Sequence, residues 1–163
     1  MRNVFYSFHY ANDAVRASQV RHMGVITGNE PCSDNNWEAV KRGGDLAIQR
    51  WIDKEMVGRT CLVVLVGSQT CGRKWIDYEI KHAWNNNKGV VAVKIHQLKN
   101  FSGLQSTEGG NPFAGFNLTN GTSLSRVAKV YNPPYYDSKD VYKYIHDNLP
   151  KWIEEAIAIR KAY

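Results

Sequence analysis

The chain has 163 residues, of which 43% are hydrophobic and 22% are charged, and its formal net charge is +6 at pH 7. This length favours one domain, and the composition is typical of a globular protein rather than a disordered or fibrous one. No apolar run approaches the roughly 18 residues of a membrane-spanning helix, and the first ten residues lack a secretion signal. We therefore expect a cytoplasmic protein without a membrane partner.

The basic residues are scattered and form no cluster or motif that is typical of nucleic-acid recognition. We interpret the positive charge as a solvated surface, although it would also suit a small anionic ligand such as a dinucleotide. The three cysteines, Cys32, Cys61 and Cys71, are odd in number and widely spaced. Such a pattern argues against a disulfide framework or a zinc site, and no metal is expected.

The first half of the chain alternates between apolar runs and helical patterns. Its first run, NVFYSF, is short and aromatic, and a polar residue shortly after it can begin a helix. The predicted elements are a strand at 3–8, a helix capped by Asn12 or Asp13 that runs to about Met23, a short strand at 24–27, and helical sequence from about Trp37 to Met56, broken at Gly43-Gly44. In the second part of that helical sequence, one face is predicted from Leu46, Ile48 or Gln49, Ile52 and Met56.

The second half opens with the clearest strand, TCLVVLVG at 60–67. It is continuously apolar, as expected of a strand that is buried on both faces. The elements predicted after it are a helix over 73–87, a strand at 89–95, a strand at 126–131, and helical sequence from about 138 to 160, in which Pro150 either starts a second segment or kinks the first.

Strands that alternate with helices predict an α/β fold, with a parallel sheet covered by helices on both faces. Five strands suggest the order 2-1-3-4-5, which reverses between the first and third strands. Ligands bind such sheets outside the carboxyl ends of the strands at the reversal point. The segments SFHY (7–10) and GSQT (67–70) should therefore meet at a ligand crevice.

Residues 97–125 show no clear periodicity. A structureless segment of this length is uncommon in a compact domain and is usually functional or disordered. Phe101, Phe113 and Phe116 give it aromatic side chains that can pack, which argues against disorder. We expect a single domain over 1–163 with an irregular insertion at about 97–125, which serves as a lid or as a partner surface.

Glu79 lies one helical turn after Trp75 in the segment RKWIDYEIKHAW (73–84). At 100° per residue, Ile76, Ile80 and Ala83 share the face that should pack on the sheet, and Glu79 lies on its flank. Glu79 is either a surface carboxylate beside a tryptophan that covers the core edge, or a carboxylate that faces the ligand crevice.

A single carboxylate suits the cleavage of a nicotinamide dinucleotide. The nicotinamide leaves as a neutral base and needs no general acid, whereas ordinary glycoside hydrolysis pairs two carboxylates. Glu79 could hold the ribose hydroxyls, stabilise the oxocarbenium charge, or accept a proton from the attacking hydroxyl or water. An aromatic side chain, Phe8 or Trp75, could pack against the nicotinamide ring.

The strings VFYSFHY (4–10), NNWEAV (35–40), VLVGSQT (64–70) and WIDYEI (75–80) occur in an order that resembles the TIR-like family, and in particular its ThsB-type sensors of the bacterial Thoeris antiphage system. GGNPF (109–113) extends this resemblance more weakly. It implies a flavodoxin-like TIR fold and an enzyme that converts NAD, as its substrate, into a cyclic ADP-ribose isomer. That messenger activates a separate effector protein, ThsA.

The resemblance also implies roles for individual residues. Its catalytic glutamate falls on Glu79, and its ligand-facing segment after the first strand falls on Ser7, Phe8 and His9. Its loop that borders the site falls near Asp34 and Trp37.

Three other residues are substrate-binding candidates from the sequence pattern itself. Trp75 could contact the nicotinamide ring. Ser68 and Gln69 could cap the following helix, or they could donate to a phosphate or ribose.

The sequence departs from receptor TIR domains at the end of the first strand. Those domains continue into an acidic segment, whereas this chain continues into Phe8-His9-Tyr10. We therefore transfer no receptor-type assembly contacts to this chain. Activation could still involve a homo-oligomer or a phage-derived trigger.

Three other classes of protein are alternatives to an NAD-converting enzyme. A non-catalytic interaction module is the main alternative, because fold alone does not decide function. A phosphate-accepting receiver domain would need an acidic cluster after the first strand, where this chain has Ser7-Phe8-His9. A hydride-transfer enzyme would need the Gly-x-Gly-x-x-Gly motif at that position, which the chain lacks.

Overall fold

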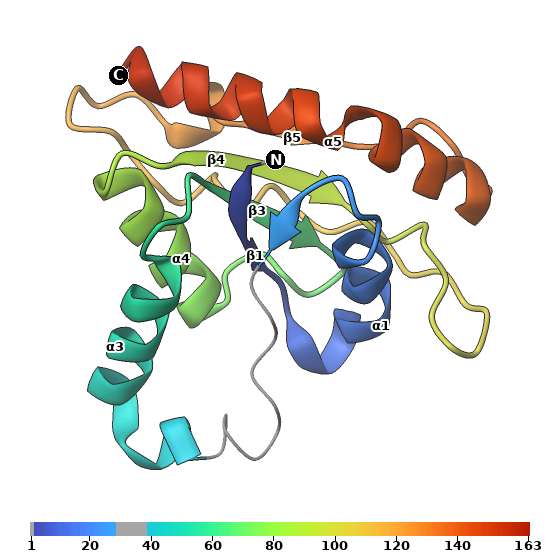
Figure 1. Ribbon diagram of the computed structural model, residues 1–163, viewed down its shortest axis with the longest axis horizontal. Helices are drawn as coiled ribbons and strands as arrows, with labels where there is room; N and C mark the ends of the chain where they lie inside the picture. Colours follow the sequence, from blue (N-terminus) through green and yellow to red (C-terminus); the bar gives the residue numbers. More distant parts are fainter. Residues whose placement is uncertain (1, 29–38) are drawn as a thin grey trace.

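The computed structural model describes residues 2–28 and 39–163. Its centre is one parallel sheet of five strands in the order β2-β1-β3-β4-β5 (Figure 1). This order confirms the predicted α/β fold with order 2-1-3-4-5. The strands are β1 (Asn3–Ser7), β2 (Thr27–Gly28), β3 (Cys61–Val66), β4 (Gly89–Lys94) and β5 (Lys129–Tyr131).

Helices cover both faces of the sheet, α1 and α5 on one face and α3 and α4 on the other (Figure 1). Residues 39–42 are also helical, and the predicted break follows them at Gly43. No helix of the described residues has the length and apolar character needed to cross a membrane. The helices are α1 (Tyr10–Arg21), α3 (Gly44–Met56), α4 (Lys74–Asn85) and α5 (Ser138–Lys161), with a 3-10 turn η1 (Leu124–Arg126).

Strand β3 is the core of both layers, and all six of its side chains are fully buried. Because successive side chains on a strand point to opposite faces, the strand divides its side chains between two hydrophobic clusters. Cys61, Val63 and Leu65 pack with α1 and α5. Leu62, Val64 and Val66 pack with α3 and α4. This two-sided burial explains why the sequence of β3 is continuously apolar.

The helical faces follow the predicted periodicity with one exception. Ile76, Ile80 and Ala83 of α4 are buried against the sheet as expected. In α3 the buried residues are Ile48, Ile52 and Met56, but Leu46 is 57% exposed. The inclusion of Leu46 in this face was wrong, because it lies two residues from Ile48 and therefore about 200° around the helix.

Two predicted helix boundaries were also wrong. α1 begins at Tyr10 with His9 in the N-cap position, so neither Asn12 nor Asp13 caps the helix. α5 runs without interruption from Ser138 to Lys161. Pro150 therefore starts no second segment, which was one of the two predicted alternatives, and a kink at Pro150 within the single helix stays a prediction.

Residues 97–125 contain little regular structure but are attached to the sheet. Phe113 is fully buried in the cluster beneath α3 and α4. The backbone N–H of Ser106 donates to the carbonyl of His96 over 2.7 Å. A Cβ on Gly109 would lie 2.1 Å from the carbonyl oxygen of Gly67, so the segment touches the end of β3 directly. Phe101, by contrast, is 94% exposed.

We predict that Gly89→Ala destabilises the protein by about 1–3 kcal/mol, as overpacking commonly does. Gly89 begins β4 directly beneath α5, and an added Cβ would lie 2.8 Å from the backbone of Ala156 and Ile157. Urea unfolding would measure the change. The matched control is Gly115→Ala, where a Cβ meets no atom within 4 Å. Equal stability of the two variants would contradict this packing.

Candidate active site

The carboxyl ends of β1 and β3 lie side by side, because Ser7 pairs in register with Val64. The chain leaves β1 for α1 on one face of the sheet and leaves β3 for α4 on the other face. The two exit segments meet where Asn12 Nδ2 donates to Ser68 Oγ over 3.3 Å. The structure therefore brings the segments 7–10 and 67–70 together at the predicted reversal point.

Glu79 lies on α4 between the buried residues Ile76 and Ile80. The residue as a whole is half-buried, but its Oε2 atom is inaccessible to solvent and has no hydrogen-bond partner among the described residues. Burial raises the pKa of the Glu79 carboxyl to about 8. At pH 7 most of the carboxyl is therefore protonated, so Glu79 is not an ordinary surface carboxylate.

Ser7 is a polar group that acts on the carboxyl of Glu79. Its hydroxyl shifts the pKa of Glu79 downward, against the larger effect of burial. Ser7 is 1% exposed, and its Oγ makes no hydrogen bond of normal length and angle within the described chain. Buried polar atoms nearly always have partners. Ser7 Oγ and Glu79 Oε2 therefore keep hydrogen-bonding capacity that the described residues do not use.

His9 follows Ser7 at the end of β1 and is half-buried. Its Nδ1 atom is buried without a partner among the described residues. Burial lowers the pKa of His9, the positive charge of Arg73 acts in the same direction, and Asp13 opposes them. The shift favours the neutral imidazole, in which one ring nitrogen donates a hydrogen bond and the other accepts one.

Asp13 is a buried polar residue of this crevice, and sequence reasoning did not predict its burial. It is fully buried in the first turn of α1 and lies 3.6 Å from the guanidinium of Arg16. Burial raises the pKa of Asp13 although Arg16 acts against it. Asp13 and Arg16 fall on the same helical face as Ala17 and Val20, and this periodicity was the signal that could have predicted their burial.

The close packing of this crevice leaves no space for a side chain at Gly67. A Cβ at this position would lie 2.1 Å from Asp13 Oδ2, so no larger residue fits against the buried carboxyl. Thr70 Oγ1 accepts from the backbone N–H of Gly67 over 2.8 Å. This bond fixes the turn that carries Ser68 and Gln69.

Phe8 is not brought together with Glu79. Since side chains alternate along a strand, Ser7 points toward α4, and Phe8 packs against the cluster of α1 and α5. There its ring is 6.2 Å from the ring of Tyr10. Trp75 lies on the α4 side, partly buried, with its ring 5.9 Å from Tyr78.

Ser68 and Gln69 do not cap α4, so that alternative was wrong. The N-cap position of α4 is Arg73, and the two residues lie in the preceding turn. Ser68 accepts from Asn12, as described above. Gln69 is exposed, and its side-chain oxygen accepts from Arg73 Nη2 over 3.2 Å. Sequence reasoning did not single out Arg73, whose positive charge also acts on the imidazole of His9.

Two other predicted site residues, Asp34 and Trp37, lie outside the described residues. Within the part of the chain that the structure describes, no group of three or more His, Cys, Asp or Glu side chains is placed to hold a metal ion.

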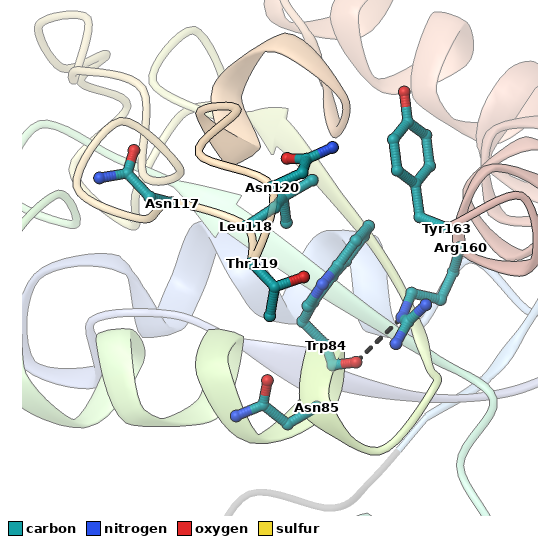
Figure 2. Close-up of a pocket in the computed structure, with 8 residues that line it drawn as sticks. All are labelled: Trp84, Asn85, Asn117, Leu118, Thr119, Asn120, Arg160 and Tyr163. Carbon is teal, nitrogen blue, oxygen red and sulfur yellow. Dashed lines mark hydrogen bonds between the residues drawn. The ribbon is translucent and has the colours of Figure 1, made fainter.

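A cavity of about 410 Å³ lies at the far end of α4 and is not lined by Glu79. Figure 2 shows Trp84 between the segment 117–120 and the end of α5. The Arg160 guanidinium lies 4.5 Å from the centre of the Trp84 ring, and its Nε donates to the Trp84 carbonyl over 2.9 Å. These contacts attach the end of α5 to the end of α4.

The strand order and the helices on both faces are those of a flavodoxin-like α/β domain. Residues 5–100 match the family described as "Thoeris protein ThsB, TIR-like domain". This match covers more than half of the chain, and the protein belongs to that family.

One relative is the protein named "Putative cyclic ADP-D-ribose synthase ThsB1" from Bacillus cereus (strain MSX-D12). It is 31% identical to this chain over 118 residues, which cover 69% of this chain and 61% of the relative.

We predict that the stability of the wild-type protein falls between about pH 4.5 and pH 8 relative to Glu79→Gln. The folded state holds the proton of Glu79 to a higher pH than the unfolded state does. Stability therefore decreases with rising pH, by roughly 1 kcal/mol per pH unit over this window. Urea unfolding of both proteins at several pH values would measure the difference.

Glu154→Gln is the control for this experiment. The Glu154 carboxyl is paired with Arg2 Nε over 2.6 Å, and this pairing lowers its pKa. Its removal should therefore give no trend over this window, because the stability that a lowered pKa contributes is lost only below about pH 4.5. A constant difference between wild type and Glu79→Gln across the window would contradict the raised pKa.

Proposed function

We propose that this protein is an antiphage-defence enzyme that cleaves the nicotinamide–ribose bond of NAD and forms a cyclic ADP-ribose isomer. The buried carboxyl of Glu79, beside Ser7 at the carboxyl end of β1, is the observation that carries the proposal. Membership of the ThsB family and the name of the relative from Bacillus cereus support it.

In the proposed mechanism the charge of the substrate activates Glu79. The nicotinamide of NAD is a pyridinium cation, and positive charge moves to the ribose as the bond breaks. An adjacent positive charge favours the ionised form of a carboxyl. Substrate binding would therefore convert Glu79 from the neutral acid to the carboxylate, which then stabilises the oxocarbenium-like transition state.

The bond changes in this reaction are simple. The C1′–N bond breaks, and its electron pair leaves with nicotinamide as a neutral base. A nucleophile of the same molecule, either a ring nitrogen of the adenine or a hydroxyl of the other ribose, then forms the new bond to C1′ and closes the cyclic product. A hydroxyl would pass its proton to Glu79. Capture by water would give the linear product instead, with the proton of the water passing to Glu79. The shape of the site decides between these nucleophiles.

The other candidates are proposed to position the substrate. Ser7 would bind a ribose hydroxyl next to Glu79, since both have hydrogen-bonding capacity left. Ser68 and Gln69 would contact the phosphates together with the cation of Arg73. Trp75 is the remaining aromatic candidate for the nicotinamide ring, because Phe8 points to the other face of the sheet.

Roles for His9, Asp34 and Trp37 at the substrate remain predictions from the family resemblance. In the same way we propose that the product signals to the effector ThsA through the nucleotide rather than by direct contact. A phage-derived trigger or self-association would set when the enzyme is active.

We predict that Glu79→Gln retains the fold and lowers NAD turnover by at least about 100-fold, because it removes the charge but little volume. The assay is chromatography with mass detection of nicotinamide and ADP-ribose products. It uses concentrated protein and, in parallel, lysates of phage-infected cells that express each form. Glu154→Gln is the control, since Glu154 is exposed and lies on α5.

Unchanged turnover in Glu79→Gln would remove Glu79 from the mechanism. No turnover by the wild-type protein in either setting would favour the alternative, a non-catalytic interaction module.

We also predict a pH dependence for the reaction. In the free enzyme the Glu79 carboxyl must lose its proton, so kcat/KM should rise with pH toward a plateau above about 8. With the cationic substrate bound the pKa is lower, and kcat should reach its plateau at a lower pH. Steady-state kinetics between pH 5.5 and about 9 test this. Profiles of kcat and kcat/KM that coincide would contradict the proposed coupling of substrate charge and proton loss.

A further inference from the structure

A groove of about 590 Å³ runs along the outer face of α1 and is not used by the proposed reaction. One wall is formed by Phe8, Tyr10 and Val15, and the other by residues 99–101. Tyr10 is 49% exposed and Phe101 is 94% exposed. Large aromatic side chains gathered on an open surface commonly mark an interaction site.

The turn that carries Phe101 is held by its own hydrogen bonds. Asn100 Oδ1 accepts from the backbone N–H groups of Ser102 and Leu104, each over 3.0 Å. The N–H of Gly103, a residue with a φ of +72°, donates to the carbonyl of Asn100 over 3.0 Å. Phe101 is therefore presented to solvent by a fixed backbone, and its backbone loses little entropy when a partner covers it.

Polar side chains of α1 fix this wall against the helix. Arg16 is 5% exposed. It donates from Nε to the Leu98 carbonyl over 2.8 Å and from Nη2 to the Leu104 carbonyl over 2.9 Å. Gln19 Nε2 donates to the Lys99 carbonyl over 2.7 Å. The two walls of the groove are thus held at a set separation before any partner arrives.

The charges around the groove select the kind of partner. Arg21 and Lys99 supply the positive charge of its lining, and none of the described residues that line it is an Asp or a Glu. A second copy of this chain would bring the same basic groove and a further net charge of +6, which disfavours self-association through this face. A small ligand would leave Phe101 and Tyr10 largely in water, whereas a polypeptide can cover both.

We propose that this groove is a docking site for an acidic polypeptide segment with an aromatic or aliphatic anchor residue. The anchor packs between Tyr10 and Phe101, and the carboxylates of the segment face the basic residues at the rim. The arrangement has the features of an interaction hot spot, with exposed aromatic side chains on a preorganised surface.

Selection from a random library of twelve-residue displayed peptides on the immobilised wild-type protein tests this proposal. Enriched peptides are expected to carry a net negative charge and at least one large apolar residue. Synthetic copies of them are then titrated by fluorescence anisotropy. We expect Phe101→Ser and Lys99→Glu each to weaken binding at least about tenfold, and salt to weaken it as well.

The matched controls are Val57→Ser and Lys54→Glu, which change an exposed apolar and an exposed basic residue at the end of α3. Thermal unfolding checks that all four variants fold. Failure to enrich peptides, enrichment of neutral or basic peptides, or binding that survives both groove variants would overturn the proposal. A wild-type dimer in sedimentation that Phe101→Ser dissociates would overturn it too, since the occupant would then be a second copy.

Discussion

The parallel pairing of β1 with β3 is the contact on which the rest of the structure depends. Because connections between parallel strands are right-handed, the chain leaves these two neighbours toward opposite faces of the sheet. The carboxyl ends between them are covered by neither α1 nor α4. This single constraint places Ser7 beside Glu79 and Asn12 beside Ser68, although these residues are far apart in the sequence.

The buried polar atoms of this crevice destabilise the folded state. Ser7, His9, Asp13 and Glu79 each have a buried polar atom without a hydrogen-bond partner among the described residues, and each such atom costs about 1–3 kcal/mol. The two hydrophobic clusters that surround β3 offset this cost. Unfavourable burial of this kind is typical of functional sites, where a ligand rather than the fold completes the hydrogen bonds.

Much of the fold could be predicted from sequence because hydrophobic periodicity reports burial directly. The continuous apolar run of β3 and the spacing of Ile76, Ile80 and Ala83 indicated which faces are covered. Asp13 was misread as a helix cap, because local propensity cannot show that a distant chain segment buries a charge. The path of residues 97–125 could not be predicted either. It is set by single contacts of Arg16 and Phe113, which leave no periodic pattern.

Hydrophobic periodicity also predicted part of the candidate site. Periodicity placed Glu79 on the flank of a helix, and the family resemblance made it the catalytic candidate. Strand alternation alone could have placed Phe8 on the opposite face from it. What periodicity cannot show is how completely a side chain is desolvated. Because desolvation keeps Glu79 protonated, a cation that binds against this carboxyl would displace its proton to the buffer. Ligand entry would then be an electroneutral exchange, and its calorimetric heat would depend on the ionisation enthalpy of the buffer.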